Sequence, residues 1–555
     1  MKHFNTHTFT RFGTMVMPFF KSEKRKVALL LLCLLVCFSY AINRVQVIMS
    51  FVNRDFMNAF TVRDSESFLN ELLKYLGCFA LATLLAVFKT YTEERFALMW
   101  RKWLTHYMLE NYFSHLAFYR LTGNREIDNP DQRIVEDVRS FTTITLSIIL
   151  IMFNSLIAIL LFIDVLWSID INLVFAVFAY AVFGSVCSFY LGRPLIDLNY
   201  EQLKKEADIR YKLINVRDNS ESIALLEGEV REKLKARQRV KRAVENLRRI
   251  INWNRNLNFF THGYNYIVTI LPLIIVSPLY LQKKITFGDV TQATIAFGHV
   301  LGALSIIVSN FGNLSSLAAV VERLGSFVDE MKNAVKDAKS SQIQLSPAEN
   351  IRFENVTILT PDRKRALISN LNLELNPGGL LITGPSGAGK SSIIRALSGI
   401  WSAGEGHIHR PSVFFLPQRP YCVIGDLRSQ FTYTTRRRAI ADWEIMEVIS
   451  LLGLEEMLDR VGGLDAEVDW NSFLSLGERQ KLSFGRLLLF KPRFACLDET
   501  TTAVDPQSEK KVYELLQQIV ENYISIGYRQ NLESYHSHVL EITSGGRSKM
   551  RAVVK

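Results

Sequence analysis

The chain has 555 residues, which is too long for one ordinary domain, and 48% of them are hydrophobic. Its net charge of +11 could indicate nucleic-acid binding, but the basic residues stand beside long apolar segments, so a cytoplasmic orientation in a membrane protein explains the charge better. The six cysteines show no metal-ligand or disulfide spacing, so we expect neither a cysteine metal site nor a disulfide framework.

Residues 1–26 form a basic segment ahead of the first long apolar run. No small-residue cleavage site follows, so we interpret the segment as the cytoplasmic flank of an uncleaved membrane helix and not as a signal peptide. Because few acidic residues stand in it, an organellar presequence is the alternative interpretation.

Six segments are long and apolar enough to cross a bilayer, which requires about 20 residues in a helix. Their approximate bounds are 27–47, 72–91, 144–167, 171–191, 264–281 and 290–310. Two prolines interrupt the fifth segment, and Gln292 and His299 interrupt the sixth. A helix bundle with a water-containing interior tolerates such residues. We therefore expect a six-helix transmembrane domain over residues 27–325.

The charge of the connections predicts the orientation of these spans. Residues 1–26, 92–143 and 192–263 together carry 29 Lys and Arg, whereas the three alternate connections carry 4. This bias places both termini and the two long loops in the cytoplasm. The long loops have a helical pattern and should extend the membrane helices beyond the bilayer; a basic surface that faces anionic lipid is the alternative role for them.

Polar segments interrupt both long loops, and another polar segment separates the membrane part of the chain from its C-terminal part. In the first long loop, Asn129-Pro130 should end one helix and Asp131 can cap the next. In the second, residues 217–224 indicate a turn followed by a polar helix. Residues 326–349 are polar and are interpreted as a linker. From 350 to 555, short β-like runs alternate with helical patterns, which predicts an α/β nucleotide-binding domain.

A glycine-rich loop follows the apolar run 380–383 and precedes a helical pattern, as in a P-loop. Glycines allow backbone N–H groups to approach phosphate oxygens, and the helix start adds a positive dipole. Lys390 would lie between the β- and γ-phosphates of ATP, and Ser391 would bind Mg²⁺. The whole loop is expected to bind the nucleotide: Gly384, Pro385, Ser386, Gly387, Ala388, Gly389, Lys390, Ser391 and Ser392.

A second acidic strand supplies the groups that a P-loop requires. The apolar run 494–497 ends in Asp498 and Glu499, about 110 residues after the P-loop. We expect Asp498 to bind the metal and Glu499 to orient or deprotonate the attacking water.

Between these motifs, Leu474-Ser475-Leu476-Gly477-Glu478 begins a helical segment, and here the chain resembles the ATP-binding cassette (ABC) transporters. The resemblance implies that Ser475, Gly477 and Glu478 bind the ATP of a second subunit. It also implies that Gln418 links the metal to the membrane domain, and that Ala503-Val504-Asp505 form the D-loop. The variant signature, residues 417–421, residues 129–133 and residues 219–224 together resemble subfamily D, the peroxisomal acyl-CoA and lysosomal cobalamin half-transporters with their bacterial relatives.

The sequence departs from this family at two positions. Near Thr360 the family has an aromatic residue that stacks on adenine, although subfamily D often lacks it. The second is Tyr528, in Ser525-Ile526-Gly527-Tyr528-Arg529, where the family has a catalytic switch histidine. A phenol carries no positive charge at neutral pH, so slow basal hydrolysis is expected. His536 and His538 are out of register and are interpreted as solvent-facing polar residues.

The resemblance implies a half-transporter: a six-helix transmembrane domain of the ABC exporter type, followed by a P-loop ATPase domain that uses ATP and Mg²⁺. Its expected partners are the lipid bilayer, a transported solute and a second half-transporter subunit, as a homodimer or alternatively a heterodimer; nucleic acid is not expected. Cobalamin, peptides or a related amphipathic solute are the expected cargo, with acyl-CoA or fatty acid as the alternative. A low-turnover ATP-binding membrane protein is a second hypothesis. The chain's length and the lack of a long targeting extension favour a bacterial inner membrane.

Overall fold

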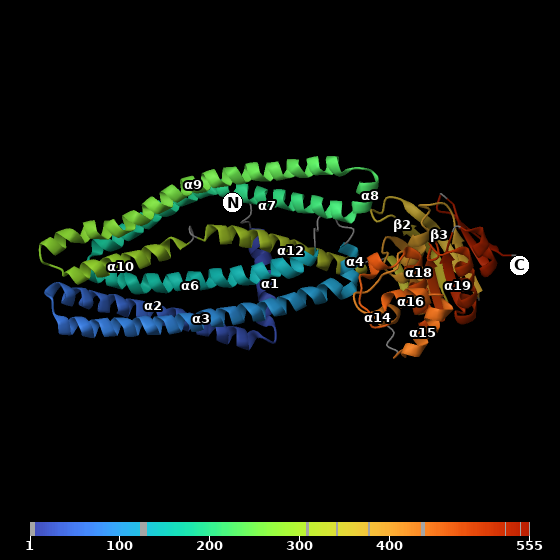
Figure 1. Ribbon diagram of the computed structural model, residues 1–555, viewed down its shortest axis with the longest axis horizontal. Helices are drawn as coiled ribbons and strands as arrows, with labels where there is room; N and C mark the ends of the chain where they lie inside the picture. Colours follow the sequence, from blue (N-terminus) through green and yellow to red (C-terminus); the bar gives the residue numbers. More distant parts are fainter. Residues whose placement is uncertain are drawn as a thin grey trace. The chain divides into compact units, whose positions relative to one another are not determined.

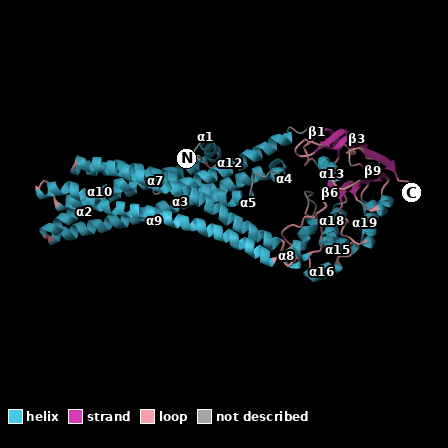
Figure 2. Ribbon diagram, turned by 90° about the horizontal axis from the view of Figure 1, so that it is seen from above, coloured by secondary structure: helices cyan, strands magenta, loops and turns pink. Residues whose placement is uncertain are grey.

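A computed structural model describes residues 6–121, 130–306, 310–339, 342–375, 378–433, 439–527, 529–543 and 545–553. The chain divides into two compact units. The first contains Met1–Phe113 and Asn124–Met331, and the second contains Ser114–Gly123 and Lys332–Lys555. Among the described residues, the first unit is helical and all strands lie in the second (Figure 2).

Long helices that run alongside one another build the first unit (Figure 1). The long helices are α2 (Arg25–Val62), α3 (Ser65–Phe113), α6 (Val138–Ile169), α7 (Ile171–Asp218), α9 (Glu229–Leu281), α10 (Phe287–Leu304) and α12 (Phe311–Lys339), which continues into the second unit. The shorter elements are α1 (Thr6–Lys21), α5 (Pro130–Gln132), the π-helical turn η2 (Arg133–Asp137) and α8 (Ser220–Leu225). In the described part of the chain, α2, α3, α6, α7 and α9 are long and apolar enough to cross a membrane. As expected, α3, α7 and α9 extend well beyond their apolar spans.

The sixth expected span falls on α10, an 18-residue helix that does not have this composition. Its side chains are buried by neighbouring helices: Phe297 and Gln292 are at most 1% exposed, and His299 stacks on Phe162 with the ring centroids 4.3 Å apart. A helix that other helices cover in this way does not need an apolar surface toward lipid. This burial explains why polar residues interrupt the expected span.

The segment expected as a linker is structured. Residues 326–339 continue α12, and β1 (Gln342–Pro347) follows and pairs with β5 (Gly404–Arg410). The apolar residues Phe327, Val328, Met331 and Ala334 are buried. They recur at helical spacing, so they form one apolar stripe even though the segment is polar on average.

The polar motif of the first long loop contacts α12. Asp128 and Asn129 lie outside the described residues, and Asp131 lies inside α5, so it is not the helix cap that was expected. A proline fits the first helical position, and α5 begins at Pro130. Arg133 donates from Nη1 to the carbonyl oxygen of Arg323 at 2.8 Å and to Ser326 Oγ at 3.1 Å.

Two sheets form the second unit. The four-stranded sheet has the order β1-β5-β2-β3, and the six-stranded sheet has the order β10-β9-β4-β8-β7-β6. In the second sheet β9, β4, β8, β7 and β6 are parallel, and β10 pairs antiparallel with β9. The remaining strands are β2 (Arg352–Leu359), β3 (Ala366–Glu374), β4 (Gly378–Thr383), β6 (Val413–Leu416), β7 (Phe494–Asp498), β8 (Asn522–Ile526), β9 (His538–Ile542) and β10 (Ser548–Ala552).

The helices from α13 to α19 pack against two hydrophobic cores. The helices of this unit are α4 (Ala117–Leu121), α13 (Lys390–Ser398), α14 (Leu427–Thr432), α15 (Asp442–Leu451), α16 (Glu455–Val461), α17 (Trp470–Phe473), α18 (Leu476–Phe490) and α19 (Pro506–Ile519). The apolar face of α13 shares one core with strands of both sheets. Residues of α14 to α19 form the other core with β6, β7, β8 and β9.

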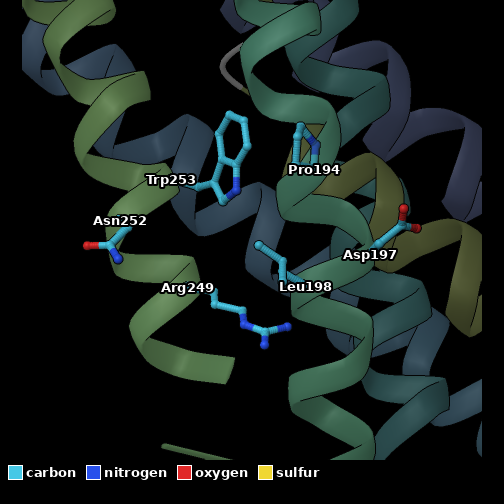
Figure 3. Close-up of a pocket in the computed structure, with 6 residues that line it drawn as sticks. All are labelled: Pro194, Asp197, Leu198, Arg249, Asn252 and Trp253. Carbon is cyan, nitrogen blue, oxygen red and sulfur yellow. The ribbon is translucent and has the colours of Figure 1, made fainter. Parts of the chain in front are cut away.

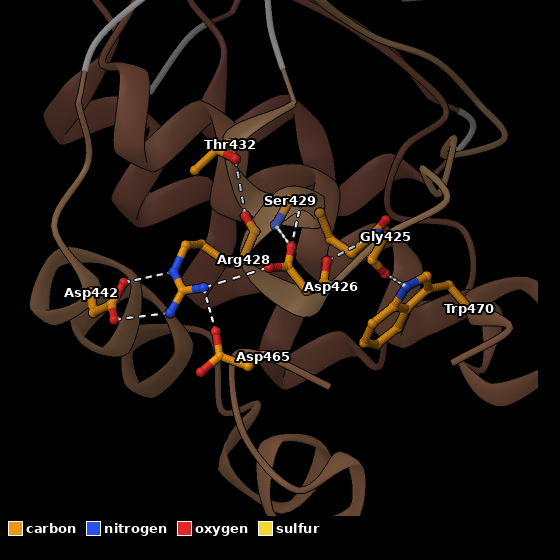
Figure 4. Close-up of polar contacts among 9 residues, drawn as sticks. Gly425, Asp426, Arg428, Ser429, Thr432, Asp442, Asp465 and Trp470 are labelled. Carbon is orange, nitrogen blue, oxygen red and sulfur yellow. Dashed lines mark hydrogen bonds and ion pairs between the residues drawn. The ribbon is translucent and has the colours of Figure 1, made fainter. Parts of the chain in front are cut away.

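Polar contacts join α14, and Gly425 just before it, with the start of α15 and with Asp465 and Trp470 (Figure 4). Arg428 donates to both carboxylate oxygens of Asp442, at 2.8 and 3.0 Å, and to Asp465 at 2.5 Å. The indole N–H of the buried Trp470 donates to the carbonyl oxygen of Gly425 at 2.7 Å. These contacts position the chain that leads into the signature segment 474–478.

Candidate functional site

Three of the predicted motifs meet at one edge of the six-stranded sheet. The P-loop follows β4, Gln418 follows β6, and Asp498 ends β7. Strand β8 lies between β4 and β7 and ends at Ile526, two residues before Tyr528. Tyr528 itself lies outside the described residues. The carboxyl ends of parallel strands are where open α/β sheets bind ligands, so this edge is the candidate nucleotide site.

The P-loop has the backbone geometry that its composition predicts. Gly384, Gly387 and Gly389 all have positive φ values. At Gly384, φ is 142°, and a Cβ atom would lie 2.3 Å from the carbonyl oxygen of Ile542, so only glycine fits there. Lys390 is buried, and its Nζ donates to the carbonyl oxygens of Gly384 and Pro385 at 2.9 and 3.0 Å. The loop therefore surrounds its own lysine.

Ser391 and Asp498 form the oxygen-rich part of the site. Ser391 Oγ donates to Asp498 Oδ1 at 3.0 Å. Burial raises the pKa of the Asp498 carboxyl, and the hydrogen bond from Ser391 opposes that rise. A hydroxyl and a carboxylate on adjacent elements are hard oxygen donors, which fit Mg²⁺ together with phosphate oxygens and water.

Gln418 and Glu499 are in direct contact. Gln418 Nε2 donates to Glu499 Oε2 at 2.6 Å, which joins the segment after β6 to the end of β7. Glu499 has a φ of 49°, a value that is uncommon for a residue other than glycine. Such backbone strain often marks a functional position. Here it occurs at Glu499, next to Asp498, whose carboxylate accepts from Ser391 of the P-loop.

The signature residues form a separate cluster at the start of α18. Ser475 is the N-cap of this helix, and its Oγ accepts from the backbone N–H of Glu478 while Glu478 accepts from Ser475. The helix approaches the D-loop at Gly477, where a Cβ atom would lie 2.8 Å from the carbonyl oxygen of Ala503. Glycine is therefore required at this close approach.

Sequence reasoning missed two links around the D-loop. Gln480 is buried, accepts from the backbone N–H of Ala503 at 3.0 Å and donates to Thr502 at 3.2 Å. Arg529 donates to Glu509 at 2.8 Å. The signal for Gln480 was a polar residue in the second turn of α18, on the helix face that then carries the buried Phe484 and Leu487.

The interpretation of His536 as a solvent-facing residue is wrong. His536 is 1% exposed and packs against the rings of Tyr513 and Tyr523, with centroid distances of 5.8 and 5.2 Å. Its Nδ1 bonds to the carbonyl oxygen of Leu532 at 2.7 Å. Burial lowers the pKa of His536 to about 4, so this histidine is neutral at physiological pH. His538 is half-buried in β9.

The first unit contains a separate hollow between α7 and α9. It has a volume of about 470 Å³ and is lined by Pro194, Asp197, Leu198, Arg249, Asn252 and Trp253 (Figure 3). It lies just beyond the apolar spans of both helices, toward the basic second loop. None of the predicted nucleotide-binding residues lines it.

Comparisons with known proteins match both units. The family "ABC transporter transmembrane region 2" matches residues 15–281, and the family "ABC transporter" matches residues 368–502. An uncharacterized ABC transporter ATP-binding protein of Synechocystis is 37% identical over 542 residues, which cover 95% of this chain and 82% of the relative. ABC transporter D family member 2, chloroplastic, of Arabidopsis thaliana is 35% identical, with coverages of 96% and 86%. The human lysosomal cobalamin transporter is 28% identical, with coverages of 97% and 94%.

Proposed function

Because this chain belongs to the ABC transporter family and is a half-transporter like those of subfamily D, we propose that it moves cobalamin, a peptide or a related amphipathic solute across a bacterial inner membrane. Its ABC domain is an ATPase coupled to transport. The observation that carries the proposal is the sheet edge at which the P-loop, Gln418, Asp498 and Glu499 meet in a chain that also has long apolar helices.

Each residue at this edge has a distinct proposed role. Lys390 and the P-loop N–H groups bind the phosphates, and the buried position of Lys390 strengthens its attraction to them. Ser391, Asp498 and Gln418 hold Mg²⁺, which supplies charge stabilisation to the phosphoryl group when it is bound. Glu499 orients or deprotonates the attacking water, and its contact with Gln418 keeps the carboxylate at the metal side of the site.

A second subunit completes the site. Ser475, Gly477 and Glu478 cluster at the start of α18, whereas the P-loop follows β4. We propose that each ATP lies between the P-loop of one subunit and the signature of the other, most simply in a homodimer. Contacts with the γ-phosphate that exist only in the closed dimer would then shift the population toward closure.

Two observations support a coupling role for the long loops. Ser114–Gly123, from the first loop, belongs to the same compact unit as the ATPase strands. In the second loop α8 is a short helix, and the side chains of Leu225 and Leu226 beside it are 78% and 81% exposed. Exposed leucines at the tip of a loop are suited to docking on another surface.

The identity of the cargo and of the membrane that contains the protein are further parts of the proposal. The name of the human relative supports cobalamin, and acyl-CoA or fatty acid is the alternative by subfamily. The 29-to-4 charge bias supports a multi-pass protein with both termini in the cytoplasm. A relative from Escherichia coli, 26% identical, is named an inner membrane ABC transporter ATP-binding protein, which supports a bacterial inner membrane. A low-turnover ATP-binding membrane protein is the second candidate function, and Tyr528 at the switch position is the observation that favours it.

Stimulation of ATPase activity tests this function. The purified full-length protein in lipid nanodiscs would be assayed with cobalamin, with a peptide panel and with a long-chain acyl-CoA. One cargo class should raise the turnover, and the Glu499→Gln variant should show neither basal nor stimulated hydrolysis. Basal hydrolysis that no cargo class changes would contradict the proposed cargo range, and a parent protein without ATPase activity would favour the low-turnover alternative.

A further inference from the structure

The acid of the signature segment is paired with a basic residue from another helix. Arg460, near the end of α16, donates from Nη2 to Glu478 Oε1 at 2.7 Å. The other oxygen of the carboxylate, Oε2, accepts from the backbone N–H and the Oγ of Ser475, both at 2.8 Å. The guanidinium of Arg460 also lies over the ring of Phe473, 5.2 Å from its centroid. Arg460 is therefore held in place by both an ion pair and a ring contact.

Glu478 carries its negative charge in this arrangement. Burial raises the pKa of its carboxyl, but the hydrogen bonds from Ser475 and Arg460 outweigh burial, and the pKa is lowered. The side chain of Glu478 is 22% exposed and that of Arg460 is 50% exposed. A carboxylate in the first turn suits the positive end of its own helix, but it repels a phosphate that approaches the same end.

We propose that Arg460 is a positioning residue that neutralises Glu478, so that the start of α18 can approach the triphosphate bound to the second subunit. This inference rests on the proposed function, in which the signature faces ATP across the dimer. Without the guanidinium, closure would bring an unpaired carboxylate toward the γ-phosphate. ATP would then have to be present at a higher concentration to drive closure, whereas the chemical step, once the dimer has closed, would be little changed.

If Arg460 had only a structural role, its substitution would affect the protein in a different way. The ion pair also ties α16 to α18, so Arg460→Ala could act by loosening the fold. Arg460→Lys and Arg460→Met separate the two explanations, because both keep an aliphatic stem against Phe473 but only lysine keeps the positive charge. If charge is the cause, Arg460→Lys should behave as the parent does and Arg460→Met as Arg460→Ala does; if the fold is the cause, lysine and methionine should have similar effects.

The test measures the ATP dependence of hydrolysis by the full-length protein in nanodiscs. Arg460→Ala should raise the ATP concentration for half-maximal rate by about two- to fivefold, as expected for loss of a partly exposed ion pair, with kcat changed less than about twofold. Arg460→Lys should stay close to the parent value, and Arg460→Met should shift as far as Arg460→Ala does. The defect of Arg460→Ala should also shrink at high ionic strength, because salt screens the repulsion.

Arg493→Ala is the matched control. It removes an exposed ion pair of similar length, Arg493 with Glu521 at 2.8 Å, from the same domain but away from the signature, and it should leave the ATP dependence unchanged. An active parent whose Arg460→Ala variant has an unchanged ATP dependence would overturn the inference alone. An Arg460→Lys variant as impaired as Arg460→Ala would overturn it too. A parent that neither binds nor hydrolyses ATP would overturn the proposed function and the inference together.

Discussion

At the scale of single residues, Tyr528 is where this chain departs most from the family. The histidine that is usual at this position would contact the γ-phosphate, and a neutral phenol replaces at most one of its interactions. Loss of one transition-state contact of this kind costs about 2.7–4 kcal/mol, or roughly a hundred- to a thousandfold in rate. We therefore predict that Tyr528→His in the purified dimer raises turnover at least several-fold, with ATP affinity little changed. Equal or lower turnover in the variant would show that tyrosine is a working substitute.

His536 should make the ATPase domain sensitive to mild acid. Among the described residues its Nε2 has no hydrogen-bond partner, so protonation would place an unpaired charge in the core. Its pKa is about 4 in the folded domain and about 6.5 when the chain is unfolded, so the unfolded state binds the extra proton first as the pH falls. The free energy of unfolding should therefore fall between pH 6.5 and pH 4, by up to about 3 kcal/mol from this residue.

Pulse proteolysis of the full-length protein in urea, scored on the ATPase-domain fragment, measures this dependence. His536→Asn can keep the bond to the carbonyl oxygen of Leu532 but cannot titrate. Its free energy of unfolding should depend less steeply on pH than that of the parent across this window. Parallel pH profiles for the two proteins would contradict the assignment.

At the scale of elements, a buried arginine joins the signature helix to the segment after Gln418. Arg486 of α18 donates to the carbonyl oxygens of Gln430 at 2.6 Å and Tyr421 at 2.9 Å. Arg486→Leu would leave these two oxygens without their donor in a region where Gln430 is fully buried. We predict a loss of about 2–4 kcal/mol in ATPase-domain stability, measured as above. Arg493→Ala, which removes an exposed ion pair, should cost less than about 1 kcal/mol.

Local patterns predicted the elements that carry chemistry. The P-loop, the acidic strand end and the helix start at Ser475 are each defined by neighbours in sequence, because strand, turn and cap preferences act over a few residues. The sheet order that brings Gln418 to Glu499 is a property of long-range pairing, and only the family resemblance indicated it. The ion pair between Arg460 and Glu478 also joins residues distant in sequence, and no sequence pattern predicted it.

The average polarity of a segment does not predict its burial when its few apolar residues recur at helical spacing. Residues 326–336 are polar on average, yet Phe327, Val328, Met331 and Ala334 are buried in α12. The helix α10 shows the converse, since its polar residues are covered by other helices and it needs no apolar face toward lipid. His536 was misread because its neighbours in sequence are polar, while its burial depends on two tyrosines from other elements.

At the scale of the whole molecule, the charge bias predicts which loops face the cytoplasm. Val62, at the end of α2, lies in an alternate connection and is 78% exposed. In a background whose six native cysteines are changed to alanine, Val62→Cys should react with an impermeant thiol reagent from outside intact cells. Asn129→Cys should react only after permeabilisation. The opposite pattern would invert the topology.

The helix α12 connects the two units covalently, since it runs from Phe311 through the boundary at Met331 to Lys339. We propose that hydrolysis at Glu499 and solute movement are one coupled process.

The most direct test is ATP-dependent solute flux in proteoliposomes that contain the full-length protein, with ATP added on the outside. Labelled cobalamin would be followed both into and out of the vesicles, beside a peptide and an acyl-CoA. We predict flux of one cargo class that requires hydrolysable ATP, with no flux for Lys390→Ala, which should lose ATP binding, or for Glu499→Gln, which should bind ATP without turnover. Flux in Glu499→Gln equal to that of the parent, or ATP hydrolysis by the parent without flux of any of these solutes, would contradict the account.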